Sequence, residues 1–188
     1  MTAAHAPILA QATWPAARAV PWEPLIVTDA ALVVLAALTR GAPAEGTMPA
    51  LACAAMAAAC VFAVNDRGDA LPAAVPTGPM RRRLHRLSVV VAGAAPAWRL
   101  LLRAVMPGVA VLGVLPVLAL VTAGVAAAVW APPAGMGGAP ALPLLWAGAD
   151  SVVAGRLGPA GEVLGWWRTA PSSVLVVALL VLLAGRHR

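Results

Sequence analysis

The sequence contains no lysine, because all thirteen of its basic residues are arginine. A P-loop ATPase needs a lysine on the nucleotide phosphates, and Schiff-base chemistry needs a lysine amine. The chain therefore hydrolyses no ATP by the P-loop route, and any energy that it uses must come from a partner.

Groups that carry out chemistry are also scarce. The histidines His5, His85 and His187 lie far apart, and no His-Glu-x-x-His motif or Gly-x-Ser-x-Gly motif is present. Cys53 and Cys60 lie in one apolar segment, about 10 Å apart along a helix axis, which is too far for a disulfide. We therefore predict no catalytic residue, no metal site and no cofactor, and we expect that the chain is not an enzyme.

Charged residues are few: they make up 11% of the chain, whereas 62% is hydrophobic and the mean hydropathy is +0.88. This composition is typical of an integral membrane protein. We predict an all-α fold, a polytopic transmembrane helical bundle in the cell membrane with the lipid bilayer as its surroundings. The net charge of +6 does not indicate nucleic-acid binding, because the arginines neither alternate with aromatic residues nor follow a recognition helix.

Six apolar segments follow an N-terminal segment, residues 1–23, which lacks the features of a signal peptide and is expected to be retained in the cytoplasm or at the membrane interface. They comprise residues 24–39, 48–64, 87–106, 109–130, 141–155 and 166–185. Residues 24–188 thus form a single transmembrane domain. The third segment is ambiguous, because Arg99 and Arg103 interrupt its apolar run.

The loop formed by residues 66–86 fixes the predicted orientation. It is the only long polar segment, and short arginine-rich loops stay on the cytoplasmic side. Six spans place both termini in the cytoplasm, with eight arginines inside and five outside; five spans give ten inside and three outside. The charge rule alone favours five spans. We prefer six, because five spans would leave an apolar segment lying on the membrane surface.

Three charged residues fall within the predicted spans: Asp29, Arg99 and Asp150. Such residues are unfavourable in lipid and tend to be paired or functional. In the six-span topology Arg99 and Asp150 lie about 10 and 9 Å from the outer ends of their spans, so they are candidates for an ion pair. The alternative is that Arg99 and Arg103 both extend to the outer headgroups.

The polar loop also contains two acids, Asp66 and Asp69, beside Arg67. These acids are consistent with metal or acid–base chemistry, but in a turn they more often cap a helix end or lie in solvent. Residues 161–165 have Gly-x-x-x-Gly spacing, which we interpret as a flexible connector rather than a helix-dimer face.

The central loop resembles a known family. An Ala-rich segment ends in Val-Asn-Asp-Arg at residues 64–67, and Ala-Ala-Val-Pro-Thr-Gly-Pro at residues 73–79 leads into a run of arginines. This pattern is similar to that of the short six-span ABC transporter permeases of actinobacteria. Those proteins have an Asp-Asp-Pro-like motif at the position of residues 65–67, and its proline is missing here.

The resemblance implies a permease subunit, a homo- or heterodimer, of an ABC-type exporter that is powered by a separate ATP-binding subunit. In six-span exporters the cytoplasmic segment between the second and third spans touches that subunit. The docking residues implied in this chain are Asp66, Arg67, Asp69, Arg81, Arg82, Arg83 and Arg86. Two alternatives stay open: a non-catalytic scaffold or accessory subunit of a larger membrane complex, and a membrane enzyme acting on lipid-linked substrates.

Overall fold

The computed structural model describes residues 17–18, 20–38, 47–64, 79–105, 113–131 and 138–185. Within these ranges the chain is helical without strands, which confirms the predicted all-α class. The helices are α2 (Glu23–Leu38), α3 (Thr47–Val64), α4 (Pro79–Val105), α5 (Val114–Trp130), α6 (Leu142–Val153), α7 (Pro159–Thr169) and α8 (Pro171–Ala184). A short 3₁₀ helix, η3 (Ala154–Arg156), leads from α6 towards α7.

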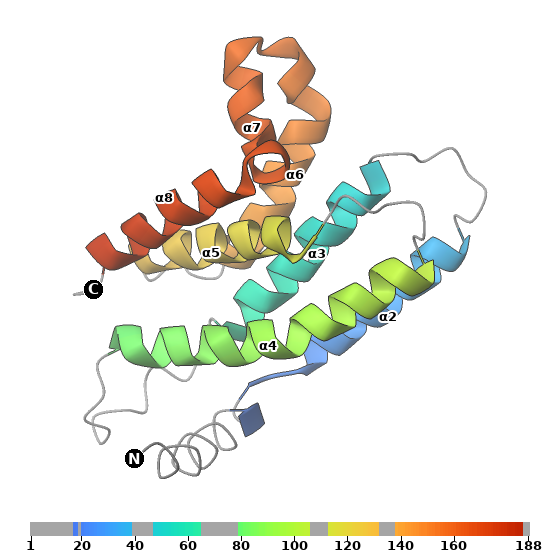
Figure 1. The fold of residues 1–188 in the computed structure, drawn as a ribbon, viewed down its shortest axis with the longest axis vertical. Helices are drawn as coiled ribbons and strands as arrows, with labels where there is room; N and C mark the ends of the chain where they lie inside the picture. Colours follow the sequence, from blue (N-terminus) through green and yellow to red (C-terminus); the bar gives the residue numbers. More distant parts are fainter. Residues whose placement is uncertain are drawn as a thin grey trace, which may run out of the picture.

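Helix α3 lies at the centre of the fold and contacts α2, α4, α5 and α6 (Figure 1). Its buried side chains are mostly small, among them Ala50, Ala52, Cys53, Ala54, Ala57 and Cys60. Small side chains allow neighbouring helix backbones to approach closely. The contact with α5 is close at Gly124, where an added Cβ would lie only 2.6 Å from Cγ2 of Val61.

Large aliphatic side chains lie mainly on the outside of two of the helices. On α8 the buried residues recur every fourth position, at Val174, Ala178 and Leu182. The exposed large residues of α2 and α8 include Ile26, Val27, Val33, Val34, Leu38, Val176, Val177, Leu180 and Leu183. The molecule therefore has small residues at its centre and an extensive apolar outer surface.

The helix directions follow a simple pattern. In Figure 1, α2 and α4 lie against each other and run in one direction, and α3 runs in the opposite direction. Helices α5 and α8 lie side by side and run parallel, because their C-terminal ends meet: Nε1 of Trp130 donates to the carbonyl oxygen of Val181 over 3.0 Å. The return from the end of α5 to the start of α8 is made by α6, η3 and α7.

Two of the predicted segments agree closely with helices. Residues 24–39 and 48–64 differ by one residue at each end or less from α2 and α3. Among the described residues, however, no individual helix combines the length and the apolar character needed to cross a membrane. One bent pair meets both criteria together, Gly161–Thr169 with Pro171–Ala184, which are inclined at 99°. Six spans remain a prediction.

The predicted loop at residues 66–86 is partly helical, contrary to expectation. Residues 79–86 form the first two turns of α4, and the helix continues past Pro96 and Arg99 to Val105. Proline is well tolerated in the first turn, where its missing N–H has no helical partner, so Pro79 starts the helix instead of extending the loop. Asp66, Arg67 and Asp69 lie outside the described residues, as does most of the segment 1–23.

The last predicted span, residues 166–185, is also wrong as a continuous helix. It is interrupted at Ala170, whose φ of −138° and ψ of 55° are not helical, and α8 begins at Pro171. Proline disfavours the α conformation in the residue before it, which explains the break. The segment 161–165 is not the flexible connector that we expected, because it lies within α7.

Candidate functional site

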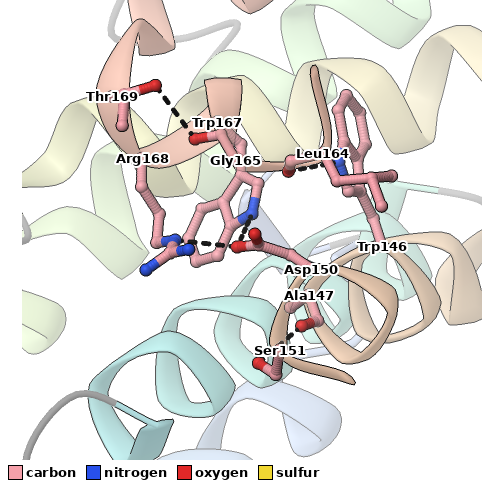
Figure 2. A network of polar contacts seen from close by, with 9 residues as sticks. All are labelled: Trp146, Ala147, Asp150, Ser151, Leu164, Gly165, Trp167, Arg168 and Thr169. Carbon is pink, nitrogen blue, oxygen red and sulfur yellow. Dashed lines mark hydrogen bonds and ion pairs between the residues drawn. The ribbon is translucent and has the colours of Figure 1, made fainter. Parts of the chain in front are cut away.

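Asp150 is the buried centre of a polar network between α6 and α7 (Figure 2). Its Oδ2 atom accepts a hydrogen bond from Nε1 of Trp167 over 3.1 Å and pairs with Nε of Arg168 at 2.7 Å. The Asp150 side chain is only 2% exposed. Its second oxygen, Oδ1, is buried without a hydrogen-bond partner. The carboxylate is therefore held on one oxygen by two donors.

The turn between α6 and α7 brings these groups together. Gly158, immediately before α7, has a φ of 53°, a left-handed conformation that glycine adopts without strain. This turn folds α7 back against α6. Nε1 of Trp146 donates to the carbonyl oxygen of Leu164 over 2.9 Å and joins the two helices at a second point. The result is a hairpin whose inner side contains Asp150.

Arg168 is the exposed member of the network. Its side chain is 44% exposed, and its guanidinium lies over the ring of Trp167, 5.6 Å from the ring centroid. The indole of Trp167 is fully buried. Arg168 therefore neutralises a buried acid while part of its side chain stays exposed at the surface.

The predicted ion pair between Arg99 and Asp150 is wrong. Arg99 is exposed on α4, and within the described chain it forms no ion pair. Helix α4 contacts α2, α3 and α5, but it contacts neither α6 nor α7 in the ranges that the structure describes. Asp150 lies on α6, whose neighbours are α3, α5, η3 and α7, so its counter-charge is Arg168 of α7 and not Arg99 of α4.

Asp29 is the second acid that the sequence singled out within an apolar helix. It lies on α2, four residues after Leu25 and three before Leu32, which are both buried. Asp29 itself is half-buried, and its Oδ1 atom is buried without a hydrogen-bond partner. Unlike Asp150, it has no ion pair with any described residue.

No family model, curated protein or solved structure matches this chain. The assignment of function therefore depends on its own side chains.

The basic end of α4 is the third candidate region. Arg81, Arg82, Arg83 and Arg86 all fall in the first two turns of this helix. Arg83 and Arg86 are half-buried, as is His85 between them. Farther along the same helix, Val90 and Trp98 are almost completely buried. Helix α4 thus connects a basic end directly to the packed interior.

Trp98 lines a narrow apolar hollow between α3, α4 and α5. The lining includes Met56, Cys60, Ala94, Val117 and Val121. The indole Nε1 of Trp98 is buried without a hydrogen-bond partner. Apart from this N–H group the lining is almost entirely apolar, so the hollow lacks the two to four polar partners that an ordered water needs.

Sequence reasoning found Asp150 but missed Trp167 and Arg168 as its partners. The signal was present, since an acid in one apolar segment is followed by a single Trp-Trp-Arg run after a Gly-Pro turn. The apolar pattern predicts residues 166–185 as one span, and this prediction separates Trp167 and Arg168 from Asp150.

Proposed function

We propose that this protein is the membrane-embedded permease subunit of an ABC-type exporter, powered by a separate ATP-binding subunit that docks on residues 66–86. The proposed location in a membrane is supported by the distribution of apolar side chains. Ile26 on α2 is 64% exposed and Leu180 on α8 is 60% exposed, whereas α3 buries mostly alanine and cysteine. Small residues between helices and large aliphatic residues outside them are typical of helices packed in lipid.

The helix directions support the six-span topology. Alternating spans require α2 and α4 to run in one direction, α3 and α5 in the other, and α8 to run parallel to α5. The observed directions agree with this order (Figure 1). The basic start of α4 and the C-terminal end of α8 then belong to the cytoplasmic side, as the charge rule requires.

The proposed coupling to an ATP-binding subunit is supported mainly by the continuity of α4. The helix runs unbroken for 27 residues from the arginine-rich end into the interior. Because Val90 and Trp98 are packed against the bundle, a displacement of the basic end moves the packed part as well. A partner that binds the arginines is therefore mechanically connected to the helices around α3.

The experiment is a pull-down of the tagged protein from its native membranes in mild detergent. We expect an ATP-binding subunit to co-purify with the wild type, and its recovery to fall about tenfold when Arg81, Arg82 and Arg83 are all changed to Ala. Three surface charge contacts of about 0.2–1 kcal/mol each account for a loss of this size. Arg99→Ala is the matched control, because Arg99 is exposed on the same helix, beyond its basic end.

Two results would contradict the proposal. Equal recovery from the triple variant and from Arg99→Ala would remove the arginines from the docking surface. Recovery of a different membrane complex, with no ATP-binding subunit in a well-folded preparation, would favour the accessory-subunit function instead.

A further inference from the structure

Asp29 lies at the border between the buried and the exposed face of α2. Leu25 and Leu32, one turn before and after it, are buried, whereas Ile26 and Val33 on its other side are exposed. The residue is half-buried: its Oδ1 atom is buried, and the rest of the side chain is accessible from the apolar outer surface of the helix. An acid at such a border combines a negative charge with an accessible apolar surface.

No positive group of the chain neutralises this acid in the part that the structure describes. Helix α2 packs against α3 and α4. On α3, Cys60 is close enough to interact electrostatically with Asp29, and a thiol supplies no positive charge. The titratable side chains described on α4 are Arg83, His85, Arg86 and Arg99, and none of them donates a hydrogen bond to the buried Oδ1 atom of Asp29. The buried Oδ1 atom is left without a donor.

An unpaired carboxylate in apolar surroundings is unfavourable, and a bound positive charge relieves this cost. A small hydrated ion is poorly suited to the site, because no group of three His, Cys, Asp or Glu side chains lies together among the described residues. A cation with a large apolar body fits better. Its charge approaches Asp29 while its body covers the exposed side chains of Ile26 and Val33.

We propose that Asp29 and the adjacent apolar surface of α2 form a binding site for lipophilic organic cations. If the chain is the permease proposed above, this is the class of substrate that it moves, so the transport role of the site rests on that proposal. Binding of the cation to Asp29 does not rest on that proposal, because it requires only the isolated protein in a membrane.

The test uses tetraphenylphosphonium and tetraphenylborate, two ions of nearly the same shape and opposite charge. Equilibrium binding is measured to the purified protein in nanodiscs of zwitterionic phosphatidylcholine, with empty nanodiscs as the background. We expect the wild type to bind the cation above background and to discriminate against the anion. Because this comparison needs no variant, it holds even if a substitution disturbs the fold.

Asp29→Asn should weaken binding of the cation about tenfold or more, since a charge-assisted contact is replaced by a neutral one of the same shape. Asp29→Glu should retain most of the affinity. Glu23→Gln is the matched control, because it removes the exposed carboxylate at the start of the same helix, and it should bind like the wild type.

Equal binding of the cation to the wild type and to Asp29→Asn would overturn the proposal, as would a wild type that does not distinguish the two ions. If Asp29→Asn instead dissociates a dimer and the wild type binds no cation, Asp29 contacts a second subunit and the proposal is wrong. These failures are distinct from a failure of the permease assignment, because the pull-down contains no organic cation.

Discussion

Replacing Arg168 by methionine is expected to lower the stability of the protein by about 3 kcal/mol. The change leaves the buried carboxylate of Asp150 without a counter-charge, and removal of one partner from a buried ion pair costs about 3–5 kcal/mol. The lower end of this range applies because Arg168 is 44% exposed. The thermal unfolding midpoint, measured in detergent by size-exclusion chromatography after heating, should fall by about 6–12 °C.

A double-mutant cycle separates the ion pair from other effects of this substitution. Asp150→Asn combined with Arg168→Met should be more stable than Arg168→Met alone, because the unpaired charge is removed. Arg156→Met is the control, since Arg156 is exposed in η3 on the same hairpin. If Arg168→Met and Arg156→Met unfold at the same temperature, the pair with Asp150 contributes nothing to stability.

Gly124→Ala should destabilise the contact between α3 and α5 by about 1–3 kcal/mol, the range observed for overpacked cores. The added methyl group would lie 2.6 Å from Cγ2 of Val61, which is fully buried and cannot move aside without disturbing its neighbours. At a helix position with room for the added methyl group the same substitution is favourable, because alanine is more stable in a helix than glycine by about 1 kcal/mol. The two effects have opposite signs, so the outcome is diagnostic.

Gly148→Ala provides the matched control for this prediction. Gly148 lies in α6, and an added Cβ there would have no atom within 4 Å. Its thermal unfolding midpoint should therefore equal or exceed that of the wild type. A Gly124→Ala protein at least as stable as Gly148→Ala would show that α3 and α5 do not approach as closely as the structure has them.

Hydropathy predicted helices well where the chain itself marks their ends. The bounds of α2 and α3 follow from apolar runs that stop at polar, glycine or proline residues. Hydropathy failed to predict the helix starts at Pro79 and Pro171, because the mean hydropathy of a segment does not indicate at which residue a helix begins. At Pro79 the helix begins within polar sequence, and at Pro171 it restarts within apolar sequence.

The candidate site was only partly predictable for a similar reason. Asp29 and Asp150 are conspicuous because each is an acid within an apolar segment. Their surroundings depend on which helices pack against each other, and the linear sequence pattern does not show which helices do so. Arg99 was paired with Asp150 on depth alone, whereas the left-handed turn at Gly158 gives Asp150 a partner from its own hairpin.

The parallel pairing of α5 and α8 has a consequence for the order in which the chain assembles. During synthesis, α5 emerges with its main partner still untranslated, because the whole α6–α7 hairpin must be made before Pro171 appears. Until then the strip of α5 that later meets α8 has no partner within the chain. The packing of α5 is therefore completed only when α8 has been made, and a ribosome that stops before α8 leaves one side of α5 uncovered.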